Sequence, residues 1–298
     1  MRTFEDMIAL MKGTSEKKTV VVAAADDDHT LEGLHSTMKA GLIKAVLIGN
    51  RDKINEIIKN KGYEIDAPII NVDDEQKAAE KAVFLIREGK GDFLMKGKLQ
   101  TATLLKEVVN KENGLNLGGV MSHVGLFEIP TYHKLIAISD GGMVLYPDLA
   151  QKKAIIENSV IALKGIGIDT PKVAVMAGAE VVNPKATESV DADALKKMYL
   201  AGEIKDCIVE GPISYDLAMS KEAAEIKGYE SPVAGDADVM ILPNMAAGNL
   251  VAKSLTVSGN AKMAGVIMGA KVPIVLVSRS ASSEEKFLSL LFAAAVSR

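Results

Sequence analysis

Residues 19–25 read TVVVAAA, and this run of small and β-branched residues decides the fold class. A continuous apolar run of this length is typical of a strand buried on both faces of a parallel sheet. The next segment places Leu31, Leu34 and Met38 on one stripe of a helix, and residues 44–49 (KAVLIG) then predict a second buried strand. A strand, a helix and a strand in this order form a βαβ unit.

The same alternation continues along the chain of 298 residues. Further strands are predicted near 68–72, 92–95, 117–124, 134–139, 172–177, 206–210, 237–242 and 272–278. Further helices are predicted near 51–60, 74–89, 101–111, 149–164, 191–201, 214–227, 246–257 and 284–296. This alternation indicates an α/β fold of mainly parallel sheets with helices on both faces. At about 150 residues per domain, we expect about two domains.

The composition limits which partners the protein can bind and in which compartment we expect it. The net charge is −4 with acids and bases mixed, so the basic field of a nucleic-acid-binding protein is missing. The single cysteine, Cys207, excludes an intramolecular disulfide and any site with several cysteine ligands. The N-terminus lacks the apolar core of a signal peptide, and no apolar stretch reaches the ~20 residues of a membrane span. We therefore expect a cytoplasmic protein with no nucleic-acid or membrane partner.

Several common motifs are missing from the sequence. It contains no G-x-G-x-x-G after a strand, no G-x-x-x-x-G-K-[ST], no G-x-S-x-G and no H-E-x-x-H. Its four histidines show no metal-ligand spacing. Dinucleotide binding, nucleotide hydrolysis, serine-esterase chemistry and zincin chemistry therefore lack support.

The strongest local signal lies near the C-terminus, where residues 271–279 read KVPIVLVSR. A buried strand delivers the pair Ser278-Arg279 at its carboxyl end, and a helix that begins a few residues later carries Glu285 in its first turn. Helix-start amides and a guanidinium make a natural anion site, and a carboxylate one turn away could take a proton. The alternative is a surface Ser-Arg pair followed by a helix cap at Ser282 or Ser283.

Polar residues also interrupt or follow other predicted strands. These groups are Lys96-Gly97-Lys98 before Thr101, Ser122-His123, residues 183–185 (NPK), Glu210-Gly211-Pro212 before Asp216, and Asp236 with Asp238. Because ligands of parallel α/β folds bind beyond the carboxyl ends of strands, each group is a candidate for the site. Each also has a structural interpretation: a core histidine at 123, solvated lysines at 96 and 98, and turns at 183–185 and 236–238.

Together, ordered segments spread over essentially the whole chain resemble the phosphate acetyltransferase / phosphate butyryltransferase family. The segments that carry the resemblance are 23–26 (AAAD), 47–49 (LIG), 94–97 (LMKG) with Thr101, 122–124 (SHV), 139–140 (SD), 147–149 (PDL), 182–185 (VNPK), 210–212 (EGP) with Asp216, 231–238 (SPVAGDAD), 247–249 (AGN) with Lys253, and 278–279 (SR). The Met-Lys-Gly, Ser-His-Val and Asn-Pro-Lys segments are more similar to the butyryl branch than to the acetyl branch.

The resemblance implies a reversible reaction in which a short-chain acyl-CoA, butyryl before acetyl, and phosphate give an acyl phosphate and CoA. Coenzyme A would be a substrate or product, with no bound cofactor and no metal. The implied fold is the two-domain fold of the isocitrate and isopropylmalate dehydrogenases, with an interdomain cleft and a homodimer or larger homo-oligomer. On that fold we expect one domain from residues 1–140 plus 270–298, which carries Ser278-Arg279, and a second from residues 141–269.

The resemblance also implies roles for individual residues. Ser278 and Arg279 match the family's active-site pair, in which the serine interacts with the thiol and the arginine binds phosphate. The acetyl branch has an aspartate base six residues after that arginine, where this chain has Glu285 with Glu284 beside it. Lys106 stands where the acetyl branch has an arginine, a point charge in place of a fork. The expected substrate-binding residues are Lys96, Thr101, Lys106, Ser122, His123, Asn183, Lys185, Gly211, Pro212, Asp216 and Asn249.

Functions of two other classes stay open at this point. A decarboxylating dehydrogenase that depends on NAD(P) and a divalent metal would use carboxylates such as Asp216, Asp236 and Asp238. A non-catalytic CoA-binding protein would bind CoA without acyl transfer. Within the acyltransferase class, acetyl-CoA is the alternative to butyryl-CoA.

Overall fold

The structure, a computed structural model, describes residues 1–277 and 281–297. The chain divides into unit 1, which is Met1–Thr3 with Val120–Met263, and unit 2, which is Phe4–Gly119 with Ala264–Arg298. The expected domain boundaries at 140/141 and 269/270 lie later in the chain than these divisions. The difference arises because residues 122–139 form strands that pair with each other and with a later strand of unit 1.

Unit 2 is built on a mostly parallel sheet. Its strands are β1 (Lys18–Ala23), β2 (Ile43–Gly49), β3 (Ile69–Asn71), β4 (Phe93–Lys96), β10 (Lys262–Met268) and β11 (Ile274–Val275), in the order β3–β2–β1–β4–β11–β10. The pairs from β3 through to β11 are parallel, and β10 runs antiparallel to β11. The residues of the opening sequence motif from Val20 to Ala25 are buried in β1 and just after it, as predicted for a central strand.

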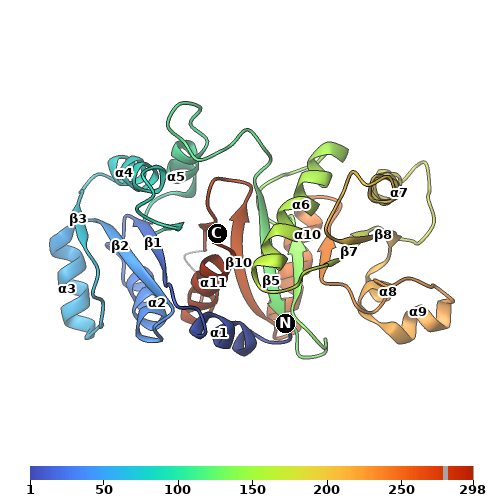
Figure 1. Ribbon diagram of the computed structural model, residues 1–298, viewed down its shortest axis with the longest axis horizontal. Helices are drawn as coiled ribbons and strands as arrows, with labels where there is room; N and C mark the ends of the chain where they lie inside the picture. Colours follow the sequence, from blue (N-terminus) through green and yellow to red (C-terminus); the bar gives the residue numbers. More distant parts are fainter. Residues whose placement is uncertain (278–280, 298) are drawn as a thin grey trace. The chain divides into compact units, whose positions relative to one another are not determined.

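Helices cover both faces of this sheet, which confirms the predicted arrangement (Figure 1). They are α1 (Phe4–Lys12), α2 (Asp28–Lys39), α3 (Arg51–Lys61), α4 (Glu75–Arg87), α5 (Thr101–Val108) and α11 (Ser283–Val296). Helix α2 packs against α11, and α4 packs against α5 on the other side of the strands. Asp27, Asn50, Asp74 and Ser282 each precede a helix and accept a backbone N–H of its first turn, which fixes where that helix begins.

The strands of unit 1 are also mostly parallel. They are β5 (Ser122–Glu128), β6 (Ile136–Ser139), β7 (Lys172–Met176), β8 (Ile208–Ile213) and β9 (Val239–Ile241), in the order β5–β6–β9–β7–β8. Strands β6, β9, β7 and β8 are parallel, and β5 is antiparallel to β6. The four parallel strands therefore end together, at what we call the carboxyl end of unit 1, and begin together at its amino end. The first residues of β5 lie at the carboxyl end.

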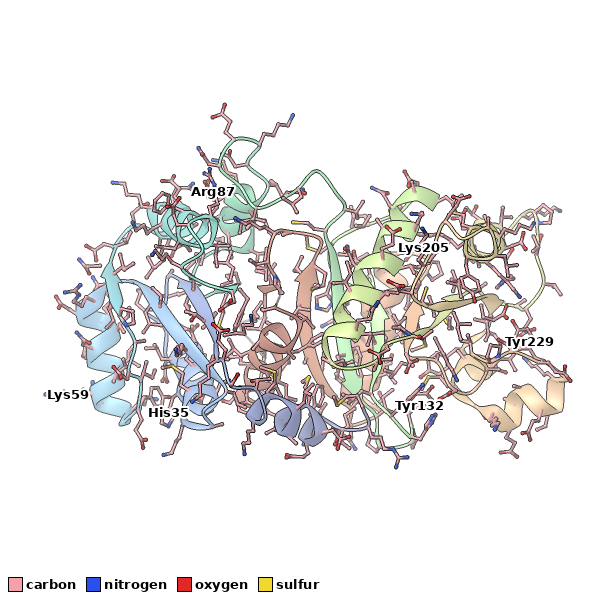
Figure 2. The ribbon with its side chains drawn as sticks, viewed as in Figure 1. His35, Lys59, Arg87, Tyr132, Lys205 and Tyr229 are labelled. Atoms are coloured by element: carbon pink, nitrogen blue, oxygen red, sulfur yellow. The ribbon has the colours of Figure 1, made fainter. Side chains whose placement is uncertain are left out.

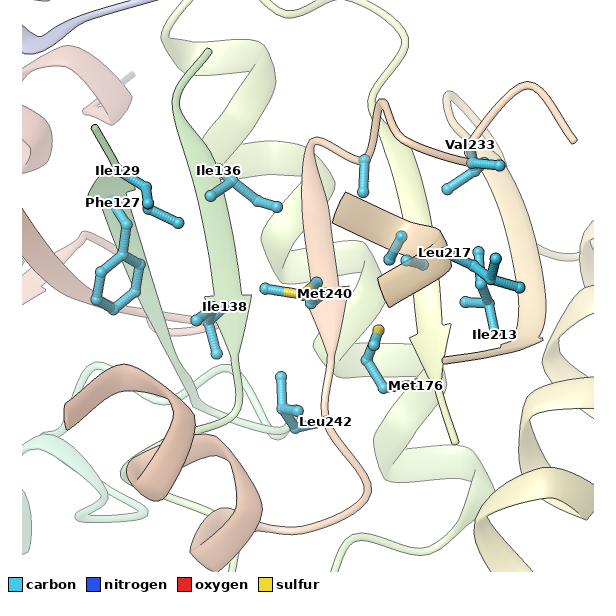
Figure 3. Close-up of a cluster of buried hydrophobic side chains, with 14 of the residues drawn as sticks. Phe127, Ile129, Ile136, Ile138, Met176, Ile213, Leu217, Val233, Met240 and Leu242 are labelled. Atoms are coloured by element: carbon cyan, nitrogen blue, oxygen red, sulfur yellow. The ribbon is translucent and has the colours of Figure 1, made fainter. Parts of the chain in front are cut away.

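Helices α6 (Leu149–Gly165) and α7 (Thr187–Leu200) pack against each other and against these strands. Helices α8 (Tyr215–Met219), α9 (Lys221–Lys227) and α10 (Met245–Val257) contribute to a separate hydrophobic cluster on the sheet. In that cluster, alternate residues such as Ile136 and Ile138 share one face of the sheet with Met240, and Leu217 of α8 belongs to the same cluster (Figure 3). Across the described residues, no helix of either unit is long and apolar enough to cross a membrane.

Candidate functional site

Lys96 ends β4 at the carboxyl end of the unit 2 sheet, as its sequence position predicts. Its side chain is buried, and its Nζ donates to the carbonyl oxygens of Gly97 at 3.1 Å and Leu99 at 3.2 Å. A Cβ on Gly97 would lie 2.1 Å from the carbonyl oxygen of Ala24, so only glycine lets this loop pass so close to the end of β1. The Lys96 ammonium group therefore donates two of its hydrogen bonds to carbonyl oxygens of its own loop.

Thr101 and Lys106 lie on α5, which follows this loop. Thr101 is the first residue of α5, Lys106 lies in its last turn, and both side chains are exposed. A hydroxyl and an ammonium group near a strand end suit an anionic ligand. The predicted catalytic residues Ser278 and Arg279 lie outside the described residues.

The start of α11 follows that pair in the sequence. Ser282 caps the helix, because its Oγ accepts the backbone N–H of Glu285 at 3.1 Å. Glu284 and Glu285 lie in the first turn, and the buried Lys286 donates from Nζ to the carbonyl oxygen of Ala281 at 2.8 Å. The predicted cap at Ser282 is confirmed, and it coexists with the two acids that are the candidates for the base.

Ser122 and His123 open β5 at the carboxyl end of unit 1, beside the end of β6. Ser122 is fully buried, and its Oγ accepts a hydrogen bond from Nδ2 of Asn158 on α6 at 2.9 Å. The backbone N–H of His123 donates to Oδ1 of Asp140 at 3.1 Å, and its carbonyl oxygen accepts the hydroxyl of Ser139 at 2.8 Å. The backbone of His123 is thus held from both sides by the two residues at the end of β6.

The His123 ring is half-buried. Burial lowers the pKa of its imidazole below the usual 6.5, and the nearby Asp140 carboxylate partly offsets that effect. At neutral pH the ring is therefore uncharged, with one nitrogen that donates a hydrogen bond and one that accepts.

The first turns of helix α10 pack against the loop that follows β6. A Cβ on Gly248 would lie 2.3 Å from the carbonyl oxygen of Asp140, so a glycine at this position lets the helix approach. The exposed Asn249 donates from Nδ2 to the carbonyl oxygen of Gly141 at 3.4 Å. His123, the loop after β6 and the first turns of α10 therefore form one cluster.

A second group lies along β8. The carboxylate of Glu210 is largely buried, and its Oε1 accepts Nζ of Lys196 at 2.6 Å and the backbone N–H of Gly211 at 2.9 Å. Gly211 itself packs tightly, since a Cβ there would lie 2.9 Å from a β7 side chain. Pro212 and Tyr229 line a pocket of about 350 Å³ with these residues. The predicted residues Gly211 and Pro212 thus border a pocket within unit 1.

Asp216 follows β8 and lies in the first turn of α8. The hydroxyl of Ser214 lies 2.6 Å from Oδ1 of Asp216 and 2.5 Å from Oε1 of Glu180. Nζ of Lys227 lies 3.0 Å from Asp216 and 3.2 Å from Glu180. The hydrogen bonds from Ser214 and Lys227 lower the pKa of Asp216 to about 2 and also lower the pKa of Glu180. Both carboxylates are charged at neutral pH, which suits binding and orientation better than proton transfer.

Asn183 and Lys185 lie in the loop between β7 and α7. Both side chains are exposed, and Oδ1 of Asn183 accepts the backbone N–H of Lys185 at 3.0 Å. The predicted turn at 183–185 is confirmed. A role for these two side chains in binding stays a prediction.

The amino end of unit 1 carries a dense ion-pair cluster. Nζ of Lys134 lies 2.8 Å from Asp236 and 2.7 Å from Asp238. His133 places Nε2 2.8 Å from Asp236, and Nζ of Lys172 pairs with the same carboxylate. Hydrogen bonds from the two lysines and His133 hold the pKa of Asp236 well below its usual range, although burial acts in the opposite direction.

This cluster bears on the dehydrogenase alternative. Asp236 and Asp238 precede β9 at the amino end, whereas Asp216 follows β8 at the carboxyl end. The structure therefore separates the three acids that this alternative would bring together. The turn before β9 lies at 232–235, earlier than the predicted 236–238, and Tyr132 donates from its hydroxyl to the carbonyl oxygen of Ala237 at 2.8 Å in the segment that follows it (Figure 2).

Sequence reasoning did not predict roles for Asp140, Glu180 or Lys196. Their partners are backbone N–H groups or side chains on other elements, which no local pattern identifies. The one available signal was at Asp140, because a carboxylate directly after a buried strand and before Gly141-Gly142 is typical of a loop held by its own backbone.

Comparisons with known proteins identify the family. Residues 74–294 match the family model described as phosphate acetyl/butaryl transferase. A phosphate butyryltransferase of Clostridium acetobutylicum is 41% identical over 99% of this chain and 98% of its own, and a phosphate acetyltransferase of Thermotoga maritima is 41% identical over 97% and 98%. The crystal structure of a branched-chain phosphotransacylase from Enterococcus faecalis superposes with a TM-score of 0.84 at 34% identity, covering 94% of this chain and 98% of that one. The chain belongs to the phosphate acetyl/butyryl transferase family.

Proposed function

We propose that the chain transfers a short-chain acyl group between the thiol of CoA and phosphate, with butyryl-CoA preferred to acetyl-CoA. The observation that carries the proposal is the extent of the family match, because residues 74–294 include every residue predicted to bind substrate or to act in catalysis. The dehydrogenase alternative has no support from these relatives. CoA binding without turnover is an outcome of the test below.

The proposed reaction needs an anion site, a proton carrier and donors for an oxyanion. Hydrogen phosphate attacks the thioester carbonyl, a C–O bond forms, and the carbonyl oxygen becomes anionic. The C–S bond then breaks, and the proton of hydrogen phosphate ends on the CoA sulfur, so atoms and charge balance. In the proposal, Arg279 binds phosphate, Ser278 contacts the sulfur, and Glu285 carries the proton. Fixed hydrogen-bond donors stabilise the oxyanion.

The proposal also includes the finer features that the resemblance implies. These are an arrangement of the two units like that of the isocitrate and isopropylmalate dehydrogenases with an interdomain cleft, a homodimer or larger homo-oligomer, and a cytoplasmic location. The absence of a bound metal or redox cofactor is part of the same proposal.

The preferred acyl chain is the open question within the family. Relatives named for butyryl and for acetyl transfer are each 41% identical to this chain, so overall identity does not decide between them. The preference for butyryl rests on the Met-Lys-Gly, Ser-His-Val and Asn-Pro-Lys segments. One methylene is worth only about 1–3 kcal/mol of discrimination, so activities on neighbouring chain lengths should overlap.

The decisive experiment is thiol release from acetyl-, propionyl- and butyryl-CoA, each with and without phosphate. Phosphate-dependent release with the highest kcat/KM for butyryl-CoA is expected. Release that does not need phosphate would identify a thioesterase and contradict the proposal. CoA binding without release would identify a binding protein.

Arg279→Ala tests the phosphate site. Loss of a phosphate clamp should lower kcat/KM by about 10²–10³-fold. Arg87→Ala is the matched control, because Arg87 pairs with Asn113 on the surface and has no proposed role. Equal activity of the two variants would remove Arg279 from the site.

The base is tested by Glu285→Gln against Glu284→Gln. Both acids lie in the first turn of α11, so the two variants make the same chemical change at neighbouring positions. Glu285→Gln should slow turnover more. Equal or reversed effects would reassign the base.

A further inference from the structure

Asp140 is a buried carboxylate whose oxygens accept hydrogen bonds from backbone N–H groups. Only 2% of its surface is exposed, and among the described residues it forms no ion pair with a lysine or arginine. Its Oδ1 accepts the N–H groups of His123 at 3.1 Å, Gly142 at 2.9 Å and Met143 at 3.1 Å, and its Oδ2 accepts those of Val144 at 2.6 Å and Met143 at 3.2 Å. A buried charge is tolerated only with such full hydrogen bonding.

These bonds join two separate segments. Gly142, Met143 and Val144 belong to the loop after β6, whereas His123 belongs to β5. One carboxylate therefore fixes the loop and the histidine in a single geometry. A carboxamide cannot reproduce it, because its NH2 group would face the N–H of Val144.

The ring of His123 is the part of the residue that remains available. Among the described residues, its nitrogens have no hydrogen-bond partner. Glycines flank it on two sides, since a Cβ on Gly125 would lie 3.3 Å from its Cε1 and a Cβ on Gly142 would lie 3.6 Å from its Cγ. A half-buried ring on a fixed backbone, whose nitrogens have no partner in residues 1–277 and 281–297, is positioned to meet a ligand.

The charged residues on the elements packed against β5 and β6 can be named. Asp140 follows β6; helix α6, which packs against β5, carries Lys152, Lys153, Glu157 and Lys164, and helix α10, which packs against β6, carries Lys253. Lys152 pairs with Asp191 at 2.6 Å and Glu157 with Lys153 at 2.5 Å. The Asp140 carboxylate is the charge that acts on the His123 imidazole.

We propose that Asp140 is a positioning residue: by fixing the backbone of His123 against the loop after β6, it places the imidazole to hydrogen-bond the thioester of the acyl-CoA. This inference rests on the proposed function. A neutral imidazole can donate one N–H to the carbonyl oxygen, and that bond strengthens as the oxygen becomes anionic. No covalent step at His123 is involved.

The first test is the titration of His123 measured by NMR in the wild type, Asp140→Asn and Ser139→Ala. The chain has only four histidines, so the Cε1–H signals can be resolved, and His123→Gln assigns the relevant one. Removing the negative charge should move the His123 midpoint down by about 1 pH unit. Ser139→Ala removes a hydrogen bond to the same residue without a change of charge, so its midpoint should stay in place. An unchanged midpoint in Asp140→Asn overturns the inference.

The second test is the pH dependence of kcat/KM for the acyl-CoA at fixed phosphate. Because the neutral ring is the active form, activity falls as the pH drops through the His123 midpoint. In Asp140→Asn this acid limb should move to lower pH in step with the NMR midpoint, although the maximum falls about 10-fold or more. A merely structural role would lower the maximum and leave the limb in place. Phosphate ionises identically in all variants and cancels in the comparison.

His123→Gln keeps the inference testable if Asp140→Asn does not fold. The glutamine side chain carries a donor and an acceptor but no titratable group, so the acid limb should disappear while measurable activity remains. Persistence of the limb would overturn the inference. Phosphate-independent thiol release in the wild type would instead contradict the proposed function, and the NMR midpoints would still decide the link between Asp140 and His123.

Discussion

Two carboxylate sites at opposite ends of the unit 1 sheet are satisfied in different ways. At the amino end, Asp236 and Asp238 face Lys134 and Lys172, so opposite charges satisfy one another. At the carboxyl end, Asp140 is satisfied by backbone N–H groups, and the ring nitrogens of the neighbouring His123 have no partner among the described residues. In the amino-end cluster, Asp236 pairs with two lysines and His133, and the buried Asp238 pairs with Lys134, so these two acids have little capacity left for a ligand. An acid that is held by backbone N–H groups, as Asp140 is, can instead position a neighbouring side chain that remains able to bind a ligand.

The largest expected effect on stability is at the amino end. Lys134→Met should lower the free energy of unfolding by about 3 kcal/mol, because it leaves the buried Asp238 without its cation. The measurement is urea denaturation, with kcat/KM expected to stay at the wild-type value. Lys164→Met is the matched control: it breaks an exposed pair with Asp206, so it should cost less than about 1 kcal/mol. Equal losses would remove the contrast between a structural cluster and ordinary surface pairs.

A smaller effect is expected where α10 meets the carboxyl end. Gly248→Ala should cost about 1–3 kcal/mol and also lower activity, because the new methyl group would clash with the carbonyl oxygen of Asp140. Thermal unfolding and thiol release measure the two effects. Gly142→Ala is the control for stability, since its Cβ would make ordinary contact at 3.5 Å. A mild Gly248→Ala and a severe Gly142→Ala would contradict the described packing.

The pH dependence of stability should distinguish Asp236 from its amide. The pKa of Asp236 is lowered in the folded chain, so its contribution is complete above its unfolded pKa of about 4 and disappears as the pH falls toward the folded value. At pH 6 the free energy of unfolding of the wild type should exceed that of Asp236→Asn by about 1 kcal/mol, after allowance for screening by water. The difference should disappear in strong acid. Urea midpoints from pH 6 down to pH 2 measure it. A gap that widens on acidification would contradict the ion pairs.

The smallest effect on stability is expected at Asp216, an exposed acid of the carboxyl end. Asp216→Asn should leave the urea midpoint unchanged and raise the KM for acyl-CoA roughly threefold to tenfold, the loss of one hydrogen bond. Because the pKa of Asp216 is about 2, the change in KM should be the same at pH 6 and pH 8. A change in KM that depends on pH in this range would mean that another group titrates at the site.

The fold could be predicted because its signals are local. The buried run at 19–25 and the alternation that follows it contain the strand, the helix and the parallel connection within a few tens of residues. The placement of Lys96 and Asp216 at strand ends follows from the same pattern, whereas His123 lies at the start of β5 and not at the end of the strand predicted near 117–124. What could not be predicted is the partner of each side chain, because partners come from distant segments.

Three residues illustrate that limit. Lys96 was expected beside an anion, and the structure directs its Nζ toward two carbonyl oxygens of its own loop. Asp236 was weighed as a metal ligand, and lysines from two other strand regions pair with it. Asp140 carried the resemblance without a role, since its acceptor function depends on the path of the backbone over the next four residues. Pairing across elements is a property of the folded chain and leaves no local pattern.

The discontinuity of unit 2 affects how the protein is made. Strand β11 and helix α11, which lie beside β4 and against α2, are synthesised after the whole of unit 1. At roughly 5–20 residues per second, the first part of unit 2 leaves the ribosome on the order of ten seconds before its missing strand. During that interval the edge of β4 is open to chaperones and to other nascent chains. Arg279 is also synthesised in this last segment. A chain truncated before it would therefore lack both the strand that pairs with β4 and the proposed activity.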